Sequence, residues 1–278
     1  MKIAVIGAGT MGVGIAQVFA MAGHAVILCD VNEALAAKGK AGIERGLMKL
    51  AAKGKLGPEE CENILAAITP GAVEEAADAG LVLEAVKEDE AVKRALFSIL
   101  SGLCGEKTIF ATNTSSLSVT VLSVAAGRPV VGMHFFNPAP VMALVEVIAG
   151  LTTPPELTKT VCDLAWSLGK TPVVVNEAPG FVVNRLLIPM INEAIFVLAE
   201  GVASVEDIDA AMKLGANHPI GPLALADLIG NDVVLAIMET LQRETGEEKY
   251  RPCPLLRKMV RGGLLGKKTG KGFFAYAR

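Results

Sequence analysis

The sequence opens with Lys2-Ile3-Ala4-Val5-Ile6-Gly7-Ala8-Gly9-Thr10-Met11-Gly12, a short apolar run that passes directly into a G-x-G-x-x-G motif. The apolar run predicts a fully buried β-strand, and residues 13–22 after the motif are typical of a helix. In such a motif Gly7 permits a tight turn, Gly9 lets a pyrophosphate approach the backbone, and Gly12 lets the helix pack on the strand. This stretch therefore predicts a dinucleotide-binding fold.

A second apolar run, residues 25–29, ends in Asp30, about 20 residues past the glycines, where an acid can accept hydrogen bonds from ribose hydroxyls. The start of the helix offers N–H groups and a positive dipole end to phosphates. A carboxylate at position 30 repels a 2′-phosphate, which favours NAD over NADP. The alternative is a glycine-rich turn in some other α/β protein. The expected cofactor contacts in this region are Gly7, Gly9, Thr10, Met11, Gly12 and Asp30.

Composition excludes several classes of protein. The 278 residues carry a formal net charge of −3, so nothing favours binding to nucleic acid or to an anionic membrane. Five cysteines without a C-x-x-C pair argue against a disulfide framework or a zinc cluster, and no metal site is expected. No apolar run reaches the roughly 20 residues of a membrane-spanning helix. The first strand begins at residue 2, so no leader is expected, and the cytoplasm is the default location.

The rest of the chain divides into two halves. Strands alternate with helices up to about residue 180, which predicts a mostly parallel sheet with helices on both faces. Beyond 180 only helices are expected. The predicted fold is thus α/β, a Rossmann-like mostly parallel sheet in residues 1–180, followed by an all-α domain in 181–278. The later strands are expected at 81–86, 108–112, 130–133, 144–148 and 171–175, an inserted helix pair at 33–54 and 58–66, a helix at 155–168, and the final helices at 181–200, 204–214, 222–244 and 254–262.

The predicted helix 181–200 has apolar side chains on nearly all sides, which indicates deep burial. A domain of about 100 residues offers little core in which to bury such a helix completely. The sequence therefore predicts that the helical half forms a homodimer interface.

One histidine is placed where chemistry is expected. His134 ends the apolar run 130–133, and ligands bind at the carboxyl ends of parallel strands in open α/β sheets. A dinucleotide-dependent carbonyl reductase needs an acid that protonates the oxygen, which makes His134 the leading acid/base candidate. His24 lies in a turn before the second strand and His218 lies in a loop of the helical half. The alternative for His134 is a structural histidine.

Glu146 is the candidate partner of His134. In the alternating strand 144–148, Glu146 shares a face with Leu144 and Ile148, and a carboxylate there is costly unless it is paired. A carboxylate that accepts from one imidazole N–H fixes the tautomer and leaves the other nitrogen for proton transfer. The alternative is a glutamate on an edge strand that faces solvent.

Polar residues mark two further places. Asn113-Thr114-Ser115-Ser116 follows the strand 108–112, where hydroxyl and amide groups can donate to a developing oxyanion. The alternative is that Ser115 or Ser116 simply caps the next helix. Asn184 is a polar residue at the apolar start of helix 181–200. It is expected either to line a site at the seam between the two domains or to be a buried amide whose hydrogen bonds are satisfied.

Six blocks together resemble the short-chain L-3-hydroxyacyl-CoA dehydrogenases, and the resemblance runs along the whole chain in order. They are the glycine motif 7–12, Asn113-Thr114-Ser115-Ser116-Leu117, Met133-His134-Phe135-Phe136-Asn137-Pro138, Leu144-Val145-Glu146-Val147, Pro179-Gly180-Phe181-Val182-Val183-Asn184-Arg185, and Gly266-Lys267-Lys268-Thr269-Gly270-Lys271-Gly272-Phe273-Phe274.

The resemblance implies NAD-dependent, reversible oxidation of an (S)-3-hydroxyacyl-CoA thioester, with 3-hydroxybutyryl-CoA as the expected substrate. It implies His134 as acid/base, Glu146 as its orienting partner, and Ser115 and Asn184 as contacts to the substrate carbonyl. Glu90 is the alternative to Glu88 among the implied cofactor contacts. Those contacts are Asp30, Glu88, Lys93, Asn113, Ser115, Asn137 and Lys268. The implied contacts to the CoA phosphates are Lys53 and Lys49, although the pattern of these two lysines by itself favours a solvated surface.

Two other functions are alternatives for this sequence. A β-hydroxyacid dehydrogenase of the phosphogluconate type shares the glycine motif and an all-helical second half, but it needs a lysine near the start of the helical domain. This chain has Asn184-Arg185 there. A non-enzymatic relative that keeps only the fold could lose His134 or Glu146, and both are present.

Overall fold

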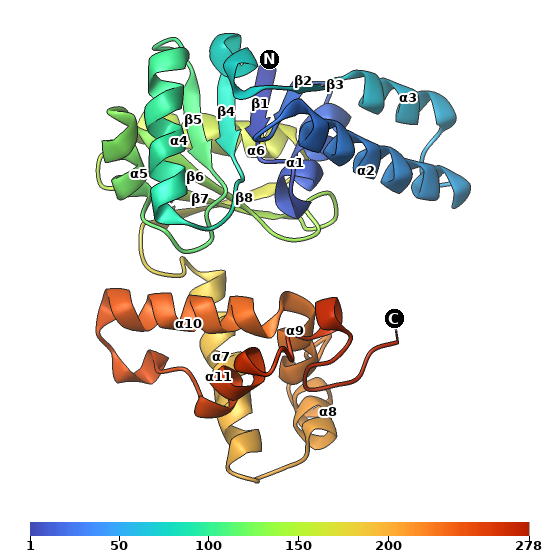
Figure 1. Cartoon of the computed structure of the whole chain (residues 1–278), viewed down its shortest axis with the longest axis vertical. Helices are drawn as coiled ribbons and strands as arrows, with labels where there is room; N and C mark the ends of the chain where they lie inside the picture. The colour runs from blue at the N-terminus through green and yellow to red at the C-terminus, as the bar shows by residue number, and fades with distance from the viewer. Residues whose placement is uncertain (278) are drawn as a thin grey trace. The chain divides into compact units, whose positions relative to one another are not determined.

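A computed structural model describes residues 1–277, and the chain divides into two compact units, Met1–Ala178 and Pro179–Arg278 (Figure 1). The boundary falls next to Pro179-Gly180-Phe181, where Gly180 and Phe181 both have positive φ angles, +74° and +51°. None of the helices within the described range is long and apolar enough to cross a membrane. The five cysteines are free thiols.

The first unit is built on an eight-stranded sheet, as an α/β fold requires. The order β3-β2-β1-β4-β5-β6-β7-β8 reverses direction at β1, next to β4. In open α/β sheets, ligand sites lie at such a switch point, outside the carboxyl ends of the strands. The strands are β1 Lys2–Ile6, β2 Ala25–Cys29, β3 Ile68–Gly71, β4 Leu81–Glu84, β5 Ile109–Thr112, β6 Val130–Phe135, β7 Leu144–Ala149 and β8 Thr171–Asn176.

The pairs among strands β1 to β6 are all parallel, β7 pairs antiparallel with β6, and β8 pairs parallel with β7. The predicted mostly parallel sheet is confirmed. The antiparallel step brings the first half of β7 beside the carboxyl end of β6, because the loop 136–143 between them is a short reversal. This places polar residues of two strands together at one edge of the sheet.

Helices cover both faces of the sheet. The helices α1 (Thr10–Met21) and α6 (Pro155–Ser167) bury Phe19, Val161 and Ala165 against one face. On the other face α4 (Glu90–Leu103) and α5 (Val119–Ala126) pack together, and the ring of Phe97 lies 5.9 Å from that of Phe110. Alternate residues of each strand serve these two cores, which explains the continuous apolar runs of the sequence.

The helices α2 (Glu33–Ala52) and α3 (Pro58–Ala66) form the predicted inserted pair. They pack on each other, and Figure 1 shows them extending away from the sheet beyond β3. Asn32 caps α2 by accepting from Leu35 N, and Pro58 occupies the first turn of α3.

The second unit is helical and has its own core. Residues such as Ile191, Leu223, Met238 and Leu256 are completely buried in it. Ser204 caps α8 by accepting from Asp207 N, as the Ser-x-x-Asp spacing suggests. The helices are α7 Val183–Ala199, α8 Val205–Gly215, α9 Pro222–Ile229, α10 Asn231–Thr245 and α11 Pro254–Arg261.

Three sequence predictions need correction. The single helix expected at 222–244 is two helices, because Gly230 between α9 and α10 has φ +107°, which no continuing helix allows. Strand β3 was not predicted, because it contains Pro70 and buries little beyond Ile68. Helix α7 is not buried on all sides within one chain, since Leu186 is 71% exposed.

Candidate active site

The glycine motif forms a bare backbone cradle at the start of α1. A Cβ on Gly12 would lie 1.7 Å from Gly7 O, and one on Gly7, whose φ is +109°, would lie 2.6 Å from Ala85 O, so neither position tolerates a side chain. At Gly9 a Cβ would meet no atom within 4 Å, which is open space in front of the helix. Gly9 is also the N-cap of α1 and has no side-chain capping bond. The loop has the shape that a pyrophosphate requires, with the positive end of the helix facing it.

Asp30 is tied to this cradle. It follows β2, its Oδ2 accepts from Ala8 N at 2.6 Å, and its Oδ1 accepts from Val31 N at 2.8 Å. Thr10 and Met11, the other predicted contacts, form the first turn of α1. The acid is therefore fixed beside the glycine loop at the switch point, where a ribose would lie next to the bound pyrophosphate.

His134 and Glu146 form a buried pair across two strands. They are directly opposite each other in the antiparallel β6–β7 ladder, so their side chains share one face of the sheet. His134 Nδ1 lies 2.9 Å from Glu146 Oε2, and the side chains are 7% and 1% exposed. A carboxylate can only accept, so Nδ1 donates to it and Nε2 is the nitrogen that can exchange a proton with a ligand.

The edge-strand alternative for Glu146 is wrong, because β7 lies between β6 and β8. The ring of Phe136 lies 4.6 Å from the imidazole of His134 and covers one side of it. The other two histidines lie elsewhere. His24 contacts the N-terminal amine in the turn before β2, where burial and that positive charge lower its pKa, and His218 lies in the second unit.

Ser115 lies at the carboxyl end of the sheet, between β5 and α5. The residue that caps α5 is Ser118, which accepts from Val121 N, so the capping alternative for Ser115 and Ser116 is wrong. Both serines instead donate to one carboxylate oxygen of Glu88. The Oε1 atom accepts from Ser115 N at 2.8 Å, Ser116 N at 3.0 Å and Thr114 Oγ1 at 2.7 Å.

This arrangement favours Glu88 over Glu90 as the site residue. Burial alone would raise the pKa of Glu88, but the Lys93 charge and the bonds from Thr114 and Ser115 outweigh it and lower that pKa. Glu90 is the first residue of α4 and pairs with Arg94 at 3.4 Å, with both side chains about half exposed. Glu88 is therefore an anion at neutral pH and lies beside Ser115.

A residue absent from the sequence prediction supports this group. Glu84 is the last residue of β4 and is completely buried; it accepts from Lys93 Nζ at 2.6 Å and from Thr112 Oγ1 at 2.6 Å. Lys93, 1% exposed, also pairs with Glu88 at 3.2 Å. Lys93 thus holds two carboxylates, so its effect on a cofactor would pass through Glu88. The signal was available, since Glu84 is a carboxylate at the end of an otherwise apolar run.

Two asparagines complete the sheet edge. Asn113 Oδ1 accepts from Phe135 N at 2.8 Å, which joins the ends of β5 and β6 and orients the amide beside His134. Asn137 is exposed in the loop that follows β6. The structure of the first unit therefore gathers His134, Glu146, Ser115, Glu88 and Asn113 at the ends of β4, β5 and β6.

The second unit holds the remaining predicted residues. Asn184 is in the first turn of α7, and Lys268 Nζ lies 2.7 Å from Asp232 Oδ2. The segment that carries Lys268 is fixed by Asp227, which is completely buried. Asp227 accepts from Phe273 N, Phe274 N and the Tyr276 hydroxyl at 2.9–3.0 Å. The Gly-Phe-Phe end of the last sequence block therefore has a structural role, because its backbone binds the buried Asp227 carboxylate.

Lys49 and Lys53 are exposed on the inserted helix pair. Helix α2 ends at Ala52, so Lys53 is its C-cap residue and not part of the helical face. No group of three or more His, Cys, Asp or Glu side chains within residues 1–277 is arranged to hold a metal ion.

Comparison with known proteins decides the family. The model of the 3-hydroxyacyl-CoA dehydrogenase NAD-binding domain matches residues 2–178, and that of the 3-hydroxyacyl-CoA dehydrogenase C-terminal domain matches residues 180–276. The chain belongs to the 3-hydroxyacyl-CoA dehydrogenase family. Residues 2–178, which include the glycine cradle and Asp30, are thus the NAD-binding domain of a dehydrogenase of this family, and the phosphogluconate-type alternative loses its support.

Individual relatives span the same length. The chain is 53% identical to the 3-hydroxybutyryl-CoA dehydrogenase of Clostridioides difficile, over 99% of each protein. It is 51% identical to the probable 3-hydroxybutyryl-CoA dehydrogenase of Bacillus subtilis, over 99% of this chain and 97% of that protein. Its fold matches the crystal structure of the (S)-3-hydroxybutyryl-CoA dehydrogenase PaaH1 from Ralstonia eutropha with a TM-score of 0.96, 47% identity, and coverage of 100% and 99%.

Proposed function

We propose that this 3-hydroxyacyl-CoA dehydrogenase interconverts (S)-3-hydroxybutyryl-CoA and acetoacetyl-CoA with NAD as the cofactor. The observation that carries the proposal is the buried His134–Glu146 pair, with 2.9 Å between Nδ1 and Oε2, at the same sheet edge as the glycine cradle. The substrate and its configuration follow the printed names of the relatives.

The nicotinamide, when bound, supplies or accepts the hydride at C3 of the acyl chain. In the direction of reduction His134 Nε2 donates a proton to the C3 oxygen, and in the direction of oxidation it removes that proton from the hydroxyl. The negative Glu146 stabilises the charged imidazolium and holds its ring orientation. Ser115 and Asn184 are proposed to contact the substrate carbonyl, and Glu88, Lys93, Asn113, Asn137 and Lys268 to act on the cofactor side.

A direct assay tests the proposal. Purified protein is mixed with NADH and acetoacetyl-CoA, and absorbance at the NADH band is followed; longer 3-ketoacyl-CoA thioesters and NADPH serve as comparisons. We expect rapid oxidation of NADH with the four-carbon thioester and a lower kcat/KM for longer chains. No oxidation with any 3-ketoacyl-CoA would contradict the proposed reaction, and a preference for long chains would contradict the proposed substrate.

Asp30 should set the choice between NADH and NADPH. Replacing Asp30 by Ala removes the acceptor for the ribose hydroxyls and the negative charge that repels a 2′-phosphate. We expect the ratio of kcat/KM for NADH to that for NADPH to fall roughly tenfold or more, which corresponds to about 1.4 kcal/mol or more of lost discrimination between the two cofactors. Asp78→Ala, an exposed acid of the same unit, is the control. An unchanged ratio in Asp30→Ala would remove Asp30 from the cofactor site.

Lys53 should act on the CoA part of the substrate and not on the chemistry. An exposed ammonium meets a phosphate as a point charge, and salt screens it with a Debye length of roughly 8–10 Å near physiological strength. Lys53→Ala should raise the KM for acetoacetyl-CoA by a few fold, leave kcat unchanged, and lose its effect as salt is added. Lys107→Ala, also exposed, is the control. An equal rise in KM for a truncated acetoacetyl thioester without the nucleotide would show that Lys53 does not contact CoA.

A homodimer through the helical unit is part of the proposal. Large apolar side chains of this unit are exposed in the single chain, among them Leu186 at 71% and Leu228 at 53%, and obligate interfaces are the more apolar kind. Static light scattering at micromolar concentration should give twice the chain mass of 28.9 kDa. A stable monomer would refute the dimer. The cytoplasmic location stays a prediction.

A further inference from the structure

Lys170 is a buried cation that the proposed chemistry does not use. It lies in the turn between α6 and β8 and is 5% exposed. Its Nζ donates to Ala139 O at 2.7 Å and to Met142 O at 2.8 Å, and burial lowers its pKa. Burying an ammonium group destabilises the fold unless its N–H groups make hydrogen bonds, and an apolar residue at this position would carry no such cost. The presence of a lysine here therefore needs an explanation.

Both carbonyls belong to the loop 136–143, which connects the strand of His134 to the strand of Glu146. The loop begins with Phe136, which covers the imidazole, and with Asn137, a predicted cofactor contact. Its own backbone supplies two hydrogen bonds, from Val141 N at 2.9 Å and Met142 N at 3.0 Å, both to Pro138 O. Thr171 N donates to Ala143 O at 2.7 Å at the end of the loop, and Lys170 adds two side-chain bonds in its middle.

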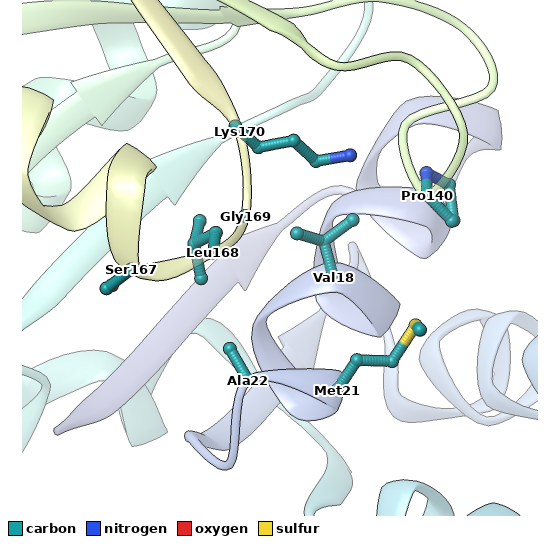
Figure 2. A pocket seen from close by; sticks show the side chains of 8 residues that line it. All are labelled: Val18, Met21, Ala22, Pro140, Ser167, Leu168, Gly169 and Lys170. Carbon is teal, nitrogen blue, oxygen red and sulfur yellow. The ribbon is translucent and has the colours of Figure 1, made fainter.

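The loop also packs on the nucleotide helix α1. Ala139 is 2% exposed, and a Cβ on Gly14 of α1 would lie 3.2 Å from the Cβ of Ala139. Next to this contact is a cavity of about 310 Å³. Figure 2 shows the Lys170 side chain, which lines this cavity, extending from the turn after α6 toward Pro140, with Val18 of α1 below it in this view. The loop is therefore held by its packing on α1 and by the two hydrogen bonds from the Lys170 ammonium.

We propose that Lys170 is a positioning residue for the hydride transfer: it fixes the loop 136–143 on α1, so that Phe136 and Asn137 stay in place beside His134 and the cofactor. The inference rests on the proposed function. It acts through the backbone, because the Lys170 ammonium donates to the carbonyls of Ala139 and Met142, which need a donor where they are shielded from water. Small displacements near reacting groups cost large factors in rate.

The test uses Lys170→Met, which keeps the apolar stem and removes the donors. The control is Lys159→Met, an exposed lysine of α6. Hydrogen exchange by mass spectrometry, without any substrate, should show faster exchange of the 136–143 peptides in Lys170→Met, with the β1 peptide unchanged. In turnover, kcat/KM for NADH should fall roughly 10- to 100-fold, while the pH profile keeps its shape, because His134 and Glu146 are intact.

A double-mutant cycle separates positioning from a general loss of stability. In an Asn137→Ala background, Lys170→Met should change kcat/KM for NADH much less than in the wild type, because the two act through one loop. A purely structural lysine would give additive effects. If Lys170→Met does not fold, Lys170→Gln replaces it. This variant keeps an amide donor, so its kcat/KM for NADH should fall less than the roughly 10- to 100-fold expected when both hydrogen bonds to the loop are lost.

The outcomes distinguish this inference from the proposed function. If the wild type is inactive but the 136–143 loop still exchanges faster in Lys170→Met, the proposed reaction is wrong and the role of Lys170 in fixing the loop stands. An active wild type, with Lys170→Met matching Lys159→Met in both loop exchange and kcat/KM for NADH, would overturn the role of Lys170.

Discussion

Replacing His134 by glutamine should lower kcat for acetoacetyl-CoA reduction by about 10²–10⁴-fold, the usual contribution of a general acid or base. The glutamine amide can still donate to Glu146, so the buried carboxylate keeps a hydrogen-bond partner and the fold should survive. The affinity for NADH, measured by its fluorescence on binding, should barely change, because the glycine cradle and Asp30 belong to other strands.

The matched control is His24→Gln, which changes a histidine of the same unit in the turn before β2 and should keep wild-type turnover. If His134→Gln also kept near-normal turnover, the proton would have to come from another group and the mechanism would be wrong. Parallel loss of activity in both variants would instead indicate unfolding.

Replacing Glu146 by glutamine should cost a comparable factor, about 10²–10⁴ in kcat, for a different reason. The amide cannot stabilise an imidazolium as a carboxylate does, and it can present a donor to Nδ1, which reverses the tautomer. Because the Glu146 side chain is 1% exposed and lies 2.9 Å from His134 Nδ1, the local electrostatic change is not screened by water. The KM for NADH should remain close to that of the wild type.

A structural role for Glu146 would give a different pattern. Glu146→Gln would then melt at a lower temperature and turn over normally while folded. Glu75→Gln, in which an exposed acid that accepts from Ala72 N is changed, is the control for loss of one carboxylate from this unit. Normal turnover of folded Glu146→Gln would remove Glu146 from the catalytic pair.

The sequence was most informative where a stretch is buried on both faces. Runs such as residues 2–6 and 130–133 predicted β1 and β6 because a parallel sheet covered by helices leaves no polar positions. Strand β3 was not predicted, because its four residues include a proline and it lies at the edge of the sheet, paired with β2. The helix break at Gly230 was not predicted, because the apolar periodicity continues from α9 into α10 and the φ of a glycine is set by its tertiary surroundings.

The site shows the same limit. Alternation along residues 144–148 placed Glu146 on the face with Leu144, but only the antiparallel register sets it opposite His134. The contact between Glu84 and Lys93 joins residues from a strand and the next helix, and no periodicity of either element reveals it. Lys170 could not be singled out, because the carbonyls it serves lie 28 and 31 residues earlier in the chain.

The central claim is that His134 moves the proton when hydride is transferred to the acyl chain. The most direct measurement is a single-turnover stopped-flow experiment, in which a limiting amount of NADH, fully bound by excess enzyme, is mixed with excess acetoacetyl-CoA and the NADH absorbance is followed. The account predicts rapid decay for the wild type and for His24→Gln, and decay at least 100-fold slower for His134→Gln with NADH still bound. Decay of His134→Gln at the wild-type rate would contradict it.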